Sequence, residues 1–163
     1  MRGVRYLPAD DYALVERSVP LVCVDFILVR RTPSGRQIGL ILRESPYGEV
    51  WCHLGGRIGR GESIAQALQR HSDDTLGVRL DLGPDPQPDH VYQWFPEDDT
   101  PSDAAKFDHG VDSRKHAIGL SFALATVGEP TPRNEAIAFD WFDLDALPQP
   151  LWPGCERLLR ALT

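Results

Sequence analysis

The sequence lacks any run of about 18 apolar residues, the length that a membrane-spanning helix needs. Its first residues contain no apolar segment typical of a secretion signal. It has three cysteines, Cys23, Cys52 and Cys155, and an odd number at scattered positions cannot be fully paired in internal disulfides. These absences predict reduced thiols, a cytoplasmic location and no membrane partner.

Basic residues are also fewer than acidic residues. Lys and Arg number 17 against 24 Asp and Glu, so the net charge is −7. An acidic protein repels polyanions, which argues against duplex nucleic acid as a partner. No internal repeat is present, and 163 residues with a 42% hydrophobic fraction are typical of one packed domain. We therefore expect a single domain over residues 1–163.

Apolar runs predict strands, and apolar residues repeating every three or four positions predict helices. Helices are expected at 8–17, between 61 and 77 and at 154–162, with a helical turn at 143–147. The polar stretch 96–114 is expected to be a functional flap or a mobile loop. Strands are expected at 21–29, 37–43, 50–54, 78–82, 90–95, 117–127 and 136–142. This irregular alternation predicts an α/β fold, an α/β/α sandwich around a mixed sheet.

A glycine-rich loop between a strand and a helix is the most informative segment. It reads Leu54-Gly55-Gly56-Arg57-Ile58-Gly59-Arg60-Gly61-Glu62. Consecutive glycines let the backbone approach a ligand, so that its amides or carbonyls become available to a phosphate or a cation. Arg57 and Arg60 add guanidinium groups that suit phosphate oxygens. The loop therefore predicts a phosphate site.

Three charged residues, Asp25, Glu62 and Arg70, have competing interpretations. Asp25 stands inside an apolar strand, and a buried carboxylate is costly unless it has a partner, which favours contact with a ligand or an arginine. Glu62 and Arg70 are eight residues apart, about two helical turns, so they can pair with each other. For Glu62 we favour structural support over catalysis.

The spacing of this segment resembles the Nudix box: Gly, five residues, Glu, seven residues, Arg-Glu, an aliphatic, one residue, Glu-Glu, one residue, Gly, an aliphatic. An acidic residue six positions before a Trp of the last strand is a further feature of that family. The positions that match are Gly56, Glu62, Arg70, Gly77, Val78, Glu135 and Trp141. The resemblance implies a Nudix-fold hydrolase of nucleoside-diphosphate-linked substrates, with a divalent cation, Mg or Mn, as cofactor. Its relatives suggest a homodimer.

The family's metal-binding glutamates are depleted here. His71 stands at the Glu that follows Arg, and Asp74 and Thr75 stand at the Glu pair. In the family these glutamates hold the cations that bridge the diphosphate and activate water. Two hypotheses therefore remain open: a hydrolase with a modified site, and a non-catalytic Nudix-like domain that binds or senses a nucleotide.

One Nudix branch, the GDP-mannose mannosyl hydrolases, also lacks the first of these glutamates and displaces the nucleoside diphosphate at the sugar carbon. Residues 18–27 resemble its first strand, in which an aspartate contacts substrate. The resemblance implies substrate binding by Asp25, Arg43 and Arg57, and catalytic roles for Glu135 and Arg70. The branch's remaining metal-binding Glu and its base His are replaced here by Thr75 and Ala136.

Two ligand sets are candidates for the cation. The first combines the Gly55 carbonyl with the carboxylates of Asp74 and Glu135, where Glu135 either ligates the ion or serves as the base. The second replaces the carbonyl with His71, which is three residues from Asp74 and therefore on a neighbouring ridge of the helix. Mixed nitrogen and oxygen ligands favour Mn, Zn or Co over Mg.

Overall fold

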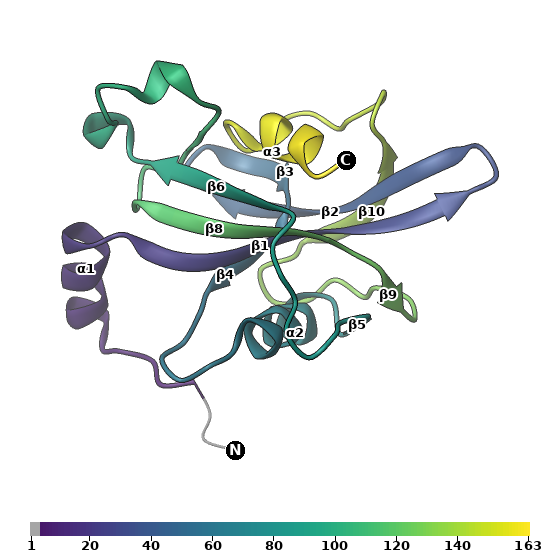
Figure 1. The fold of residues 1–163 in the computed structure, drawn as a ribbon, viewed down its shortest axis with the longest axis horizontal. Coiled ribbons are helices and arrows are strands. Elements are labelled where there is room, and N and C mark those ends of the chain that lie inside the picture. Colours follow the sequence, from purple (N-terminus) through teal and green to yellow (C-terminus); the bar gives the residue numbers. More distant parts are fainter. Residues whose placement is uncertain (1–3) are drawn as a thin grey trace.

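The fold is a three-layer sandwich, described here from a computed structural model over residues 4–163. Residues 1–3 lie outside this range. They begin the N-terminal segment for which no secretion signal is expected. Figure 1 shows a central sheet with α3 (Cys155–Ala161) on one face and α2 (Ile64–Thr75) on the other, while α1 (Ala9–Ser18) lies beside the sheet. The predicted α/β/α sandwich is thus confirmed. Within the described range, no helix combines the length and apolar character needed to span a membrane.

The main sheet is mixed, as predicted. Its strands run in the order β10-β2-β1-β8-β6-β7, with β3 added to β2 and β4 added to β1. The pairs β1·β8 and β6·β7 are parallel and the other pairs are antiparallel. Its strands are β1 (Leu21–Thr32), β2 (Gly35–Ser45), β3 (Gly48–Cys52), β4 (Leu54–Arg57), β6 (His90–Phe95), β7 (Gly110–Val111), β8 (Ala117–Leu124) and β10 (Ala138–Asp143).

A fork between β1 and β2 opens the sheet. The two strands pair at their hairpin end, from Thr32 opposite Gly35 to Leu28 opposite Gly39. Beyond that point β4 takes the edge of β1 and β3 takes the edge of β2. His53 is the residue between β3 and β4, so chain connectivity alone places it at the fork.

Helix α2 packs one stripe against the sheet. Ser63 caps it, accepting a hydrogen bond from the Gln66 N–H, while the Gln66 side chain bonds the Ser63 N–H. Such a capping box satisfies donors that the first turn leaves free. The buried stripe contains Leu68, Ser72 and Thr75. Thr75 therefore occupies a position that is almost fully enclosed, at 3% exposure.

Several expected elements differ in the structure. At 143–147, where a helical turn is predicted, β10 extends to Asp143, and one hydrogen bond from the Ala146 N–H to the Asp143 carbonyl forms a single turn that does not continue as a helix. Pro148 follows too closely for a helix to develop. The expected strand 117–127 breaks at Ala125, after which β9 (Thr126–Val127) pairs with β5 (Arg79–Leu80) in a separate sheet. The stretch 96–114 contains two short 3-10 turns, η1 (Glu97–Asp99) and η2 (Ala104–Lys106), and strand β7.

Close packing between β6 and β7 gives a stability prediction. A Cβ atom at Gly110 would lie 2.0 Å from Cε3 of the buried Trp94 ring, whereas nothing lies within 4 Å of a Cβ at Gly83. Overpacking of this kind costs about 1–3 kcal/mol. Gly110→Ala should lower the free energy of unfolding by that amount in urea titration, and Gly83→Ala should leave it nearly unchanged. Equal stabilities would contradict this packing.

Candidate functional site

Two adjoining cavities at the fork form one cleft. The inner cavity, about 70 Å³, is lined by Asp25, His53 and Trp94, among others. The outer cavity measures about 390 Å³. Both are bounded by Arg43, Gly55, Gly56, Arg114 and Lys115. The structure brings the candidate residues together here: Asp25 lines the inner cavity, and Arg43, Gly55, Arg57, Arg70, Asp74 and Glu135 line the outer one.

Asp25 organises the inner cavity. Its side chain is buried, and Oδ2 accepts a 2.9 Å hydrogen bond from the Trp94 indole. Its Oδ1 lies 3.3 Å from Nε2 of His53, whose ring stacks on Trp94. Nδ1 of His53 lies 3.6 Å from the Cys155 sulfur. The side chain is expected from the sequence to contact a ligand or an arginine; among the described residues its partners are instead a tryptophan and a histidine.

Two histidines of the cleft have pKa values displaced in opposite directions. Burial lowers the pKa of His53, but the charge of Asp25 and the hydrogen bond to it outweigh burial and raise that pKa above 6.5. For His71 burial is the largest effect and lowers the pKa, although a hydrogen bond to the Arg57 carbonyl opposes it. In the inner cavity the contact with Asp25 thus raises the pKa of His53, whereas in the outer cavity burial lowers the pKa of His71.

The loop carries glycine where a side chain would collide with backbone or ring atoms. Gly55 has φ 137°, and a Cβ atom there would lie 2.0 Å from the carbonyl oxygen of Val24. At Gly56 it would lie 2.6 Å from the ring of His71. Both glycines are thus needed for β4 to pair with β1 and to pass beside α2.

An ion pair holds the loop against α2. Nε of Arg70 lies 2.6 Å from Glu62, whose other oxygen accepts from the Gly59 N–H. Nη2 of Arg70 also donates to the Arg57 carbonyl, at 2.9 Å. The hydrogen bond from Arg70 is the main cause that lowers the Glu62 pKa below 4.5. The favoured interpretation of Glu62 as structural support is consistent with these contacts.

Glu135 reaches the cleft because its loop caps the end of α2. The Arg133 N–H donates to the Thr75 carbonyl at 2.9 Å, and the Asn134 side chain donates to the Asp74 carbonyl. The last carbonyls of a helix lack hydrogen-bond donors within the helix, and this loop supplies such donors. Glu135 then lies 2.9 Å from Nη1 of Arg43.

Arg114, Lys115 and Trp152 also line the cleft, and they are among the residues that the sequence did not identify as site residues. The Trp152 ring lies beneath two guanidinium groups, 5.6 Å from Arg43 and 5.1 Å from Arg114. Arg114 also forms a bidentate pair with Asp112, at 3.0 and 2.9 Å. Arg114 and Lys115 lie between β7 and β8, and Trp152 lies in the C-terminal part of the chain. These positions are distant in sequence from the glycine loop, so no spacing rule links them to it.

A cation would find oxygen ligands on the outer rim. Asp74 and Glu135 are exposed carboxylates that line the outer cavity together with Gly55. Hard ions such as Mg and Mn prefer oxygen ligands, so these groups remain the candidates for a cation site. The alternative set with His71 is wrong, because among residues 4–163 no three His, Cys, Asp or Glu side chains gather as a metal site. The His71 ring instead bonds the Arg57 carbonyl.

Comparison with known proteins places this geometry in a family. The sequence profile of DUF4916, described as a domain of unknown function, matches residues 3–152. The chain belongs to the DUF4916 family. This DUF4916 protein also has the fold of Nudix hydrolases, confirming the resemblance in the loop and helix. Nudix hydrolases generally use divalent cations.

Two solved structures and one curated protein illustrate the relationship. A possible asymmetric diadenosine tetraphosphate (Ap4A) hydrolase from Jonesia denitrificans is 29% identical, with TM-score 0.73 over 88% of this chain and 92% of that one. A MutT NUDIX hydrolase from Burkholderia pseudomallei is 24% identical, with TM-score 0.65 over 90% and 100%. The low-salt glycan biosynthesis protein Agl8 of Haloferax volcanii is 35% identical over 76 residues, 47% of each chain. The match to this curated relative thus spans about half its length.

The Glu62–Arg70 pair predicts acid-sensitive stability. Glu62→Gln should lower the free energy of unfolding by about 1–3 kcal/mol at neutral pH, because it removes a charged partner from a largely buried arginine. The folded-state pKa of Glu62 is depressed, so this stabilisation is present above pH 4.5 and disappears as pH falls through the lower value. Urea titrations over a pH series measure the loss.

The exposed pair between Glu156 and Arg160 supplies the control for that measurement. Glu156→Gln should change stability by less than about 0.5 kcal/mol. Equal losses in the two variants, or a Glu62→Gln loss that persists in acid, would contradict the assignment.

The two histidines should titrate apart in NMR spectra. The ring signal of His71 should move with a midpoint below 6.5, while the ring of His53 should remain protonated through neutral pH. Asp25→Asn should bring the His53 midpoint down, since burial then acts without the opposing charge. Equal titration midpoints for the two rings in the wild-type protein would contradict this prediction.

Proposed function

We propose that this protein hydrolyses nucleoside-diphosphate-linked substrates, with nucleotide sugars of the GDP-mannose type as the first class to test. The observation that carries the proposal is the gathering of Arg43, Arg57, Arg114 and Lys115 around the Gly55-Gly56 loop. In a chain of net charge −7, such a concentration of cations in one cleft selects an anion. The glycine loop lets that anion approach the backbone.

Each site residue then has a physical role. Arg43 and Arg57 bind the linked phosphates through their guanidinium groups. Arg70 uses Nε and Nη2 for Glu62 and the loop, which leaves Nη1 for charge on the departing nucleotide. Asp25 accepts hydrogen bonds from the part of the substrate that enters the inner cavity, since a carboxylate has several lone pairs beyond those used by Trp94 and His53.

Asp74, Glu135 and the Gly55 carbonyl would hold the divalent cation, Mg or Mn. When bound, the ion would neutralise negative charge on the diphosphate. This charge develops when the bond from the diphosphate to the sugar breaks, or when a bond to phosphorus breaks. Glu135 either ligates that ion or accepts the proton of the attacking water. Its contact with Arg43 keeps the carboxylate at the cleft in both cases.

A second candidate function is the non-catalytic binding or sensing of the same nucleotides. The observation that favours it is the scarcity of free carboxylates: Glu62 is bound to Arg70, Glu135 contacts Arg43, and the buried Thr75 carries no charge. A cleft with this balance binds phosphates without the full set of metal ligands that water activation needs.

Turnover assays separate the two candidates. The protein with Mg or Mn should release nucleotide from GDP-mannose, ADP-ribose or Ap4A, measured by chromatography. Glu135→Gln should lower kcat at least about 100-fold, and Arg57→Gln should raise KM about tenfold. Glu156→Gln, on the exposed face of α3, should have no effect.

The position of the label in oxygen-18 water then tests the GDP-mannose type of reaction. Label in the released sugar indicates attack at carbon, and label in the phosphate indicates attack at phosphorus. Thermal stabilisation by these nucleotides without turnover would favour the sensor. Neither turnover nor stabilisation would overturn both candidates.

Two further expectations stay predictions alongside this proposal. A cytoplasmic location is in keeping with three free, buried cysteines, since unpaired thiols suit a reducing compartment. A homodimer is implied by the Nudix resemblance alone, and sedimentation measures it directly.

A further inference from the structure

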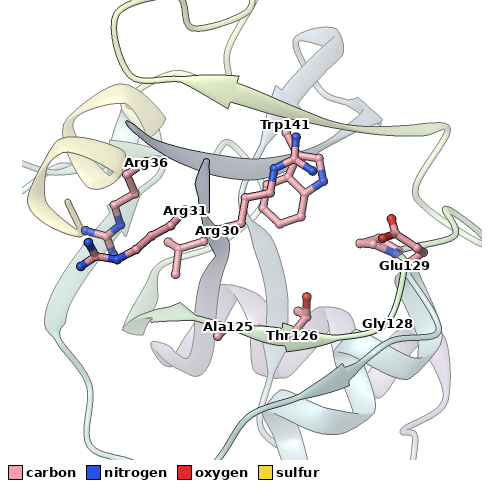
Figure 2. Close-up of a pocket in the computed structure, with 10 residues that line it drawn as sticks. Arg30, Arg31, Arg36, Ala125, Thr126, Gly128, Glu129 and Trp141 are labelled. Carbon is pink, nitrogen blue, oxygen red and sulfur yellow. The ribbon is translucent and has the colours of Figure 1, made fainter. Parts of the chain in front are cut away.

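The segment 96–114, expected to be a functional flap or a mobile loop, supplies part of the cleft wall. In Figure 1 it follows β6 as a loop with two short helical turns. Asp112 lines the inner cavity, and Arg114 lines both cavities. None of its residues is among those that line the separate cavity at the hairpin end of β1, which Figure 2 shows. The position of the segment therefore bears on the cleft.

One tyrosine hydroxyl bonds both ends of this segment. Oη of Tyr47, in the turn between β2 and β3, donates a 3.1 Å hydrogen bond to Oε1 of Glu97. The same oxygen accepts a 3.0 Å hydrogen bond from the Ser113 N–H. Glu97 begins η1, and Ser113 directly precedes Arg114. The segment thus starts and ends at a single side chain of another part of the sheet.

The turn that carries Tyr47 is itself fixed to β2. Oγ of Ser45 accepts a 3.0 Å hydrogen bond from the Tyr47 N–H and donates one of 2.6 Å to the Gly48 carbonyl. Arg43 lies on β2, four residues before Tyr47. Tyr47 therefore has a defined position relative to the strand that carries Arg43.

Asp112 orders Arg114 within its own turn. Its carboxylate accepts a 3.0 Å hydrogen bond from the Arg114 N–H and two more from the guanidinium, at 3.0 and 2.9 Å. These bonds fix Arg114 relative to Asp112, but they do not fix it relative to β2. The Tyr47 hydroxyl supplies that connection, because it bonds Ser113, the residue between them.

The ring of Tyr47 supports the same wall through Trp152. The two rings meet edge to face, with their centres 5.6 Å apart. The Trp152 ring lies beneath the guanidinium groups of Arg43 and Arg114, and its indole N–H donates to the Val111 carbonyl at 2.7 Å. Tyr47 is not among the described residues that line either cavity, so it contacts the support of both arginines from behind.

We propose that Tyr47 is a positioning residue for phosphate binding, because it ties the wall that carries Arg114 to the strand that carries Arg43. Two guanidinium groups at a fixed separation contact neighbouring phosphates of one ligand together, and less entropy is lost than when either group must first be ordered. The inference rests on the proposed phosphate-binding role of the cleft. It goes beyond that role because Tyr47 acts only through these arginines.

Inorganic pyrophosphate, titrated calorimetrically in the absence of metal, is the probe that tests this role. Tyr47→Phe keeps the ring on Trp152 and removes both hydroxyl contacts. It should weaken pyrophosphate binding about threefold to tenfold, the effect of losing a neutral hydrogen bond. Thr100→Val is the matched control: it removes a 2.9 Å hydrogen bond to the Pro96 carbonyl within the same segment and should bind as wild type.

A double-mutant cycle separates positioning from a general effect on stability. Arg114→Gln should itself weaken pyrophosphate binding, and adding Tyr47→Phe should then change the affinity less than about twofold, since the group that Tyr47 positions is gone. In the ligand-free protein, the Ser113 amide should exchange with solvent faster in Tyr47→Phe than in wild type or Thr100→Val. Equal losses of affinity in both backgrounds, or an unchanged exchange rate, would overturn the proposal.

The outcomes also separate this inference from the proposed function. Pyrophosphate binding that is unchanged in Tyr47→Phe would remove the positioning role and leave the proposed function intact. The expected loss of affinity in a protein that hydrolyses none of the nucleotides would support the positioning role and remove the hydrolase. A wild-type protein that does not bind pyrophosphate would overturn the phosphate site on which both rest.

Discussion

The buried carboxylate of Asp25 is the constraint on which the site depends. It lies in the middle of β1, between β4 and β8, where a buried carboxylate without hydrogen-bond partners would be costly. Trp94 and His53 satisfy it from two other segments. Its neighbour Gly119 must lack a side chain, since a Cβ atom there would lie 2.0 Å from Oδ2. One polar group thus determines which residues β6, β8 and the β3-β4 junction can carry.

The fork between β1 and β2 converts this local constraint into a cleft. Because the strands separate beyond Leu28 and Gly39, the β3-β4 segment enters between them and presents its glycines to α2. The Glu62–Arg70 pair and the loop at the end of α2 then hold both sides of the opening. The geometry of the proposed phosphate site therefore depends on packing among the sheet, α2 and two loops.

Charge balance distinguishes this cleft from a site rich in metal ligands. Carboxylates that could hold cations are paired with arginines, as Glu62 is with Arg70 and Glu135 with Arg43. Arg114 and Lys115 add positive charge on the opposite wall.

Local patterns in the sequence determined the sandwich, the helix after the glycine loop and the Nudix resemblance, because period, capping and glycine spacing depend on neighbouring residues. They also identified the Glu62–Arg70 pairing as a candidate interaction. At 143–147 the structure has a single hydrogen-bonded turn at the end of β10, and His71, one of the candidate metal ligands, bonds a carbonyl instead. Only the tertiary structure decided that His53 meets Asp25 and that Tyr47 meets Ser113. Those contacts depend on strand register and on the path of distant segments, which no local pattern encodes.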